Sequence, residues 1–125
     1  KLGFKKLNKP VIGFYNYADI DDSFIMSIHH WLKWHKFGFT RTWDNLSLEI
    51  RYGRMTREKA IKAIKKNGLE YPKDEIKIFC EYVNISISDF NKIADKFRNK
   101  QIWKKRNNKW SIDNFLIPDW KWNEN

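Results

Sequence analysis

The sequence predicts a mainly helical fold: a bundle of about five short helices followed by a small β-hairpin. Apolar residues recur at intervals of three and four throughout residues 23–99, which is the spacing of amphipathic helices. Glycine and proline divide this region into short segments, at Gly38, Gly53 and Pro72. Several short amphipathic helices in succession imply an all-helical packing unit, because each must bury its apolar face against another.

The first two helices are predicted on either side of Gly38. The first runs from about residue 23 to Phe37, and the second from about Trp43 to Tyr52. Gly38 and Gly53 are expected to end them, because glycine readily adopts the left-handed conformation common at helix C-termini. The N-cap candidates are Asp21, Asp22 or Ser23 for the first helix and Thr42 or Asp44 for the second.

Three more helices follow in the same region. Thr56 is expected to cap the third, which continues to the turn at 67–68. Pro72 can open the fourth, and Ser86 or Ser88 caps the fifth. The predicted apolar face of the fifth helix holds Phe90, Ile93, Ala94 and Phe97.

The chain divides into three parts. Residues 1–22 are predicted to be an extended arm or loop that leads from an N-terminal domain, and residues 23–99 form the helical domain. Residues 100–125 form a tail in which Asn107 and Asn108 separate two short apolar and basic segments. Asparagine tolerates the positive φ angles of a tight turn, so a two-stranded hairpin is expected here.

Composition restricts the functional classes. Lysine and arginine outnumber aspartate and glutamate by 25 to 15, which favours an acidic partner. The single Cys80 excludes an internal disulfide, and its helical apolar neighbours indicate a buried thiol in a reducing compartment. The sequence has no apolar run long enough to cross a membrane and no signal peptide, so a cytoplasmic location and no membrane partner are expected.

Metal binding is not predicted. His29, His30 and His35 are close in sequence, but residues five or six apart on a helix diverge, and no cysteine or acidic residue accompanies them at ligand spacing. The glycines are isolated, so they do not form a phosphate-binding loop. The chain by itself lacks a complete catalytic apparatus.

A cluster of charged residues in the second helix and its flanks is the main site candidate. Asp44 and Arg51 share one helix face, while Arg41 precedes this face and Arg54 follows it beyond Gly53. Guanidinium groups bind phosphate or carboxylate in a fixed two-pronged geometry, so the cluster suits an anionic ligand. Alternatively, Arg51 complements the helix dipole and Arg54 is a solvated loop charge.

Several segments resemble one family. They are FGFTR at 37–41, the helix around Asp44, IRYGRMTREKAI at 50–61, EYP at 70–72, FCEYVNIS at 79–86 and DFNKIADKFR at 89–98. Together they are similar to the C-terminal region of the N-acetyl sugar amidotransferases of bacterial surface-polysaccharide and flagellin-sugar biosynthesis. The resemblance covers most of the chain from about Asp21 to Trp110.

This resemblance implies a part of a larger α/β enzyme of the PP-loop ATP-pyrophosphatase superfamily. Such an enzyme converts an acetamido sugar or sugar nucleotide to an acetamidino sugar through an adenylated intermediate, in LPS, O-antigen or flagellin-glycan biosynthesis. It uses ATP and Mg²⁺, and a glutaminase subunit supplies ammonia. The family's SGGxDS nucleotide-binding loop belongs to an N-terminal domain and is absent from this sequence, so the isolated chain is expected to be inactive.

The resemblance also gives the charged cluster a role. Activation of the acetamido oxygen builds negative charge on phosphate, which cationic side chains can stabilise. The candidates are Lys36, Arg41, Arg51 and Arg54, and Asp44 would orient an arginine or accept a hydrogen bond from a sugar hydroxyl.

Two other classes of function fit the sequence. A small basic helical nucleic-acid-binding module would use the net charge and stacking aromatic residues, although its basic residues are spread over several helices. A protein-interaction domain would use exposed Trp103, Trp110 and Trp120. Convergence of the arginine-rich positions in a concavity would favour the enzyme, whereas a flat basic stripe would favour nucleic acid.

Overall fold

The structure is a computed structural model that describes residues 23–67, 69 and 71–122 of the 125-residue chain. It confirms the mainly helical fold with a C-terminal antiparallel hairpin. The predicted arm at 1–22 lies outside the described residues. The elements are α1 (Ser23–Phe37), α2 (Arg41–Arg51), α3 (Arg57–Asn67), α4 (Lys73–Val83), α5 (Ile87–Lys96), β1 (Trp103–Arg106) and β2 (Lys109–Ile112).

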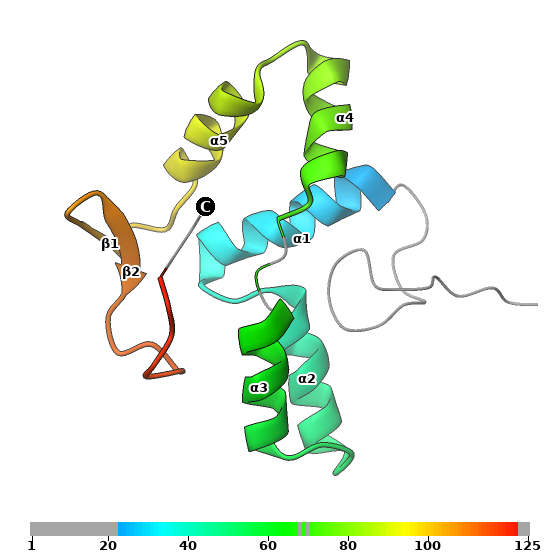
Figure 1. The fold of residues 1–125 in the computed structure, drawn as a ribbon, viewed down its shortest axis with the longest axis vertical. Helices are drawn as coiled ribbons and strands as arrows, with labels where there is room; N and C mark the ends of the chain where they lie inside the picture. The colour runs from blue at the N-terminus through cyan, green and yellow to red at the C-terminus, as the bar shows by residue number, and fades with distance from the viewer. Residues whose placement is uncertain (1–22, 68, 70, 123–125) are drawn as a thin grey trace, which may run out of the picture.

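Helix α1 is the central element of the arrangement (Figure 1). It packs against α4 and α5 on one side and against α2 on the other, and α2 packs in turn against α3. The hairpin lies beyond the C-terminal ends of α1 and α5. One helix therefore holds two helical pairs together and ends next to the hairpin.

Two of the predicted helix caps are confirmed by hydrogen bonds. The Ser86 hydroxyl accepts from the backbone N–H of Asp89 at 3.0 Å, which selects Ser86 over Ser88 as the cap of α5. The Thr56 hydroxyl accepts from the backbone N–H of Lys59 at 3.3 Å at the start of α3. Each side chain satisfies a backbone donor that has no partner within its helix.

The predicted start of α2 is wrong by two residues. The helix begins at Arg41, and its N-cap is Thr40, which is extended and whose side chain makes no capping hydrogen bond. The carbonyl oxygen of Thr40 accepts from the backbone N–H of Trp43 at 3.0 Å. Thr42, one of the predicted caps, is buried inside the first turn instead.

The core consists of two clusters that share α1. The first is rich in tryptophan and lies between α1, α2, α3, the hairpin and the segment after it, whereas the second is mainly aliphatic and lies between α1, α4 and α5. The first contains Trp34, Trp43, Leu46, Ala60, Ile64, Trp103 and Ile117, and the second contains Ile28, Ile76, Cys80 and Phe90. Because α1 contributes Ile28 to one cluster and Trp34 to the other, it couples both halves of the fold.

Two expectations about exposure are wrong. Trp103 is only 1% exposed and packs in the tryptophan cluster, so it is not a surface contact for a partner. Trp110 and Trp120 are half-buried against the same cluster. Ile93 of α5 and its C-cap residue Phe97 are 44% and 65% exposed, because only the helix face with Phe90 and Ala94 is buried against neighbouring elements.

The predicted turn of the hairpin is confirmed. Trp103 pairs with Ile112 at the open end, and Asn107 and Asn108 have φ angles of 50° and 60° at the turn. Gly38 ends α1 with a φ of 74° directly beneath this hairpin, where a Cβ would lie 2.6 Å from Ile112 Cδ1. A side chain at position 38 would therefore separate α1 from the hairpin.

Candidate ligand-binding site

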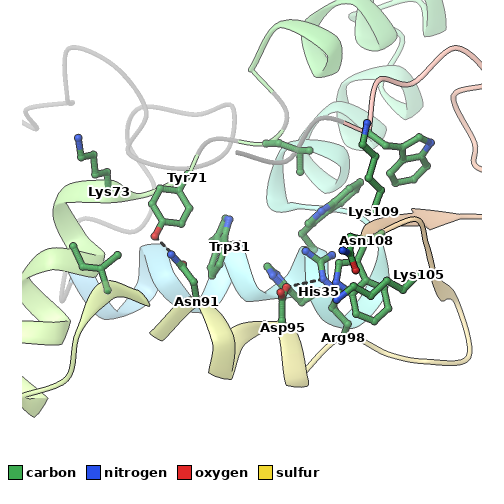
Figure 2. Close-up of a pocket in the computed structure, with 15 residues that line it drawn as sticks. Trp31, His35, Tyr71, Lys73, Asn91, Asp95, Arg98, Lys105, Asn108 and Lys109 are labelled. Carbon is green, nitrogen blue, oxygen red and sulfur yellow. Dashed lines mark hydrogen bonds and ion pairs between the residues drawn. The ribbon is translucent and has the colours of Figure 1, made fainter. Parts of the chain in front are cut away.

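A cavity of about 780 Å³ lies between α1, α5, the hairpin and the segment that leads into α4 (Figure 2). Its volume falls within the range of about 300–1,000 Å³ that is usual for small-molecule sites. Among the described residues, four cationic side chains and one carboxylate line it: Lys73, Arg98, Lys105, Lys109 and Asp95. The cavity therefore favours an anionic ligand.

Two helices that pack against each other, α1 and α5, line one side of the cavity (Figure 2). Trp31 and His35 are four residues apart on α1, and Asn91 and Asp95 have the same spacing on α5, so each pair shares one helix face. The backbone N–H of Asn99 donates to the carbonyl oxygen of His35 at 3.0 Å. This hydrogen bond ties the end of α1 to the segment that connects α5 to the hairpin.

Arg98 lies at the basic end of the cavity. Its side chain is 3% exposed, and its Nε donates to Asp95 Oδ1 at 3.0 Å. The guanidinium carbon lies 4.5 Å from the ring centroid of Trp103 and 5.4 Å from that of Trp110. Contacts with two indole faces stabilise the cation and fix the plane of its donors.

The hairpin completes the basic end. Lys105 and Lys109 line the cavity, and Lys105 Nζ lies 5.4 Å from the ring centroid of Trp110. The Nε1–H of Trp110 is buried and has no hydrogen-bond partner among the described residues. A buried donor of this kind normally has an acceptor, and Trp110 shares this feature with Trp103 and Trp120 of the same cluster.

His35 is uncharged at neutral pH. Its pKa falls from 6.5 to about 4, chiefly because burial removes the charged form from water and also because of the nearby Arg98 cation. Asp95 and the Trp31 carbonyl oppose this shift without overcoming it. Between its aromatic and basic ends, the cavity therefore holds a neutral imidazole.

The other end of the cavity is aromatic. The rings of Trp31 and Tyr71 meet edge to face with centroids 5.3 Å apart, and Trp31 also stacks on Phe90. The Tyr71 hydroxyl donates to Asn91 Oδ1 at 2.9 Å, which links the segment before α4 to α5 (Figure 2). These contacts hold apolar ring surface at a fixed position in the cavity wall.

The residues of the predicted charged cluster lie outside this cavity. Near the junction of α1 and α2, Asp44 forms an ion pair with Lys33, and Arg41 Nη1 lies 3.0 Å from His30 Nε2. Lys36 is exposed at the end of α1, with Nζ 5.4 Å from the ring centroid of Phe37.

The other two arginines lie near the turn between α2 and α3. Arg54 donates to both carboxylate oxygens of Glu49, from Nε at 3.0 Å and from Nη2 at 2.9 Å, and its guanidinium lies 4.9 Å from the ring centroid of Tyr52. Arg51 is exposed in the last turn of α2. The role of the predicted cluster in phosphate binding stays a prediction.

Sequence reasoning did not select the residues that line the cavity, although a signal was present. Tyr71 belongs to the EYP segment, and Asn91, Asp95 and Arg98 belong to DFNKIADKFR, two segments that carry the family resemblance. The structure brings these segments together. Polar residues at intervals of four and three along the second segment also indicate one shared face.

The described residues include no metal-binding cluster, and the thiol of Cys80 is buried. Within residues 23–67, 69 and 71–122, no group of three histidine, cysteine, aspartate or glutamate side chains is arranged to hold a metal ion. Cys80 is buried as predicted, and burial raises the pKa of its thiol. Across the described part of the chain, no helix combines the length and apolar character needed to span a membrane.

The cavity lies almost wholly within a region that matches a known family. The model of the C-terminal domain of WbpG-like LPS biosynthesis proteins matches residues 13–116. The chain belongs to this family. Of the cavity residues, Trp122 lies beyond the match, whereas the segments with Trp31, Tyr71, Arg98 and Trp110 lie inside it. A search of curated proteins found no match.

Proposed function

We propose that the chain is the C-terminal part of an ATP-dependent N-acetyl sugar amidotransferase that modifies a sugar for LPS. The observation that carries this proposal is the family match over residues 13–116, which includes the segments between 37 and 98 that resemble the amidotransferases. A basic cavity with aromatic walls supports it, because an activated acetamido sugar carries both ring surface and negative charge.

The proposed reaction replaces the oxygen of the sugar's acetamido group by nitrogen. The acetamido oxygen attacks the α-phosphorus of ATP, and pyrophosphate leaves. Ammonia then attacks the acetamido carbon, and AMP departs with the original oxygen. The product is an acetamidino sugar. Cations at the reacting centre would stabilise the charge that develops on the phosphate groups.

This chain would supply the sugar-side wall of such an enzyme. The sequence contains no SGGxDS loop, so the proposal assigns ATP and Mg²⁺ to an N-terminal PP-loop domain. Ammonia would come from a glutaminase subunit, and the reaction would take place in the cytoplasm. Flagellin-glycan biosynthesis is a second setting for the same chemistry.

The complete protein tests this proposal. Purified enzyme that includes the N-terminal domain is incubated with ATP, Mg²⁺, ammonium chloride and an acetamido sugar nucleotide. AMP formation that depends on the sugar, together with a product of one mass unit less, is expected, since NH replaces O. The 125-residue chain alone should form no AMP. Release of ADP instead of AMP, or turnover by the isolated chain, would refute the proposed assignment.

The nucleic-acid-binding module stays an alternative hypothesis. Four cations line a concave site rather than a flat stripe, which favours the enzyme. Because nucleic-acid affinity falls steeply with salt when phosphate contacts dominate, binding of an unrelated duplex between 50 and 200 mM salt is a direct check. Tight and strongly salt-dependent binding would favour the alternative.

A further inference from the structure

A strongly basic surface lies outside the cavity, at the end of α5, in the turn that follows and on the outer face of the hairpin. Its cations are Lys96, Lys100, Lys104 and Arg106. We infer that this basic surface docks the protein on an anionic lipid bilayer. The inference goes beyond the proposed function and does not rest on it, because it depends only on side chains that do not line the cavity.

Charge is distributed unevenly along the chain. Residues 96–112 contain seven lysines and arginines and no aspartate or glutamate, so they carry +7 of the formal net charge of +10. All of these cations except Arg98 are exposed. Clusters of about four to eight cations at a protein surface are typical of segments that bind anionic lipid headgroups.

The geometry of the hairpin directs these cations away from the core. Lys104 and Arg106 are two residues apart on β1, so they share the face opposite to that of the buried Trp103. Lys104 Nζ donates to the carbonyl oxygen of Lys100 at 3.4 Å, which brings the turn after α5 next to this face. The hairpin lies at the edge of the molecule (Figure 1), so its outer face is open to a partner.

The three lysines of the basic surface have no carboxylate partner within the described residues. Arg106 donates to both carboxylate oxygens of Asp113, at 2.7 and 3.0 Å. Lys96, Lys100 and Lys104 form no ion pair with any residue of 23–67, 69 and 71–122. Their charges are therefore available to an external anionic surface.

An exposed aromatic ring favours a membrane over other polyanions. Phe97 follows Lys96 at the end of α5 and is 65% exposed. Proteins that bind at the membrane interface combine cations for the headgroups with apolar side chains that enter the boundary region. The expectation of no membrane partner rests on the lack of a long apolar run, which this mode of binding does not require.

The test is binding of the 125-residue chain to vesicles of phosphatidylcholine alone and of phosphatidylcholine mixed with phosphatidylglycerol, measured by co-sedimentation. The test variant combines Lys100→Ala with Lys104→Ala. The matched control combines Lys59→Ala with Lys62→Ala, at exposed positions of α3. Because both double variants lose the same net charge, a difference between them reports where the charge lies.

The chain should bind the vesicles that contain phosphatidylglycerol and not those of phosphatidylcholine alone. The test variant should bind about thirtyfold more weakly, since each lysine near an anionic surface contributes a factor of about five. The control should lose less than about threefold, because salt screens charges that lie far from the surface. Phe97→Ala removes no charge and should also weaken binding.

Four results would overturn the inference. They are absence of binding to anionic vesicles, equal losses in the two double variants, an unchanged affinity in Phe97→Ala, and tighter binding of a nucleic-acid duplex than of anionic vesicles at the same salt concentration.

Discussion

Arginine has different surroundings in two regions of the molecule. At the turn between α2 and α3, Arg54 is exposed and pairs with Glu49, five residues away. At the cavity, Arg98 is buried, pairs with Asp95 and contacts Trp103 and Trp110 of the hairpin. Arg54 contacts only neighbours in the sequence in these interactions, whereas Arg98 also contacts the hairpin. A fixed, desolvated arginine beside a cavity binds an anion more strongly than a solvated one, because water competes less.

The largest expected difference between the two regions is in stability. Trp103→Ala removes a 1% exposed indole from the tryptophan cluster and from beneath Arg98, so the free energy of unfolding should fall by about 3–5 kcal/mol. Tyr52→Ala removes a 65% exposed ring beside Arg54 and should cost less than about 1 kcal/mol. Urea denaturation measures both. If the two variants lost the same free energy of unfolding, the aromatic contacts of Arg98 would stabilise the fold no more than those of Arg54.

The pH dependence of stability should distinguish the regions next. The pKa of His35 is about 4 in the fold and 6.5 when unperturbed, so below pH 6.5 the unfolded chain binds a proton that the folded chain does not. The contribution of neutral His35 to the free energy of unfolding is therefore fully present above pH 6.5. It is lost as the pH falls toward 4, and the loss amounts to as much as about 3 kcal/mol.

Urea denaturation at several pH values checks this prediction. His35→Gln should flatten the decrease between pH 6.5 and 4, whereas His29→Gln, at an exposed position on the same helix, should not. An unchanged slope in His35→Gln would mean that groups other than His35 cause the decrease.

A smaller effect is expected at the start of α5, the helix that forms one wall of the cavity. Ser86→Ala removes the 3.0 Å capping bond to the Asp89 N–H and should cost about 1 kcal/mol. Ser88→Ala is the control and should change stability by no more than about 0.5 kcal/mol. The melting temperatures of the two variants, measured by thermal denaturation, check this difference. A larger loss in Ser88→Ala would contradict the assigned cap.

The smallest effect on stability is expected at the turn. Arg54→Lys keeps the charge and loses the two-pronged contact with Glu49, which for an exposed pair contributes about 0–1 kcal/mol. Its melting temperature, and that of Arg51→Lys, should change little. Steady-state kinetics of the proposed full-length amidotransferase test the predicted phosphate-binding role. Lost turnover with an intact fold would support that role, whereas unchanged turnover in both variants would remove these arginines from the site.

Features set by nearby residues could be predicted from the sequence. The cap at Ser86, the positive φ angles of Gly38 and Gly53, and the Asn107-Asn108 turn each depend on a few neighbours and are all confirmed. Helical periodicity likewise indicated the five helices, because each must bury an apolar face. The predicted start of α2 is two residues too late. Thr40 and Thr42 have the same side chain, and only the position of Thr42 inside the first turn distinguishes them.

The cavity could not be predicted in the same way. Periodicity indicates which residues share a helix face, as with Asn91 and Asp95, but not what that face meets. The surroundings of Arg98 depend on the docking of α1 and of a hairpin whose Trp110 is twelve residues further along the chain. The resemblance includes the segments that line the cavity, but the arginine pattern around Gly53 is denser and is the stronger local signal for an anion site.

An anionic ligand is expected to bind in the cavity rather than at the turn between α2 and α3. Nuclear magnetic resonance of the ¹⁵N-labelled chain during titration with uridine diphosphate tests both regions at once, because the indole N–H groups and the Gly53 amide give separate signals. The indole signals of Trp31 and Trp110 should shift with ligand concentration, while the backbone signals of Gly53 and Arg54 stay in place. Shifts at Gly53 and Arg54 with both indole signals unmoved would contradict the account.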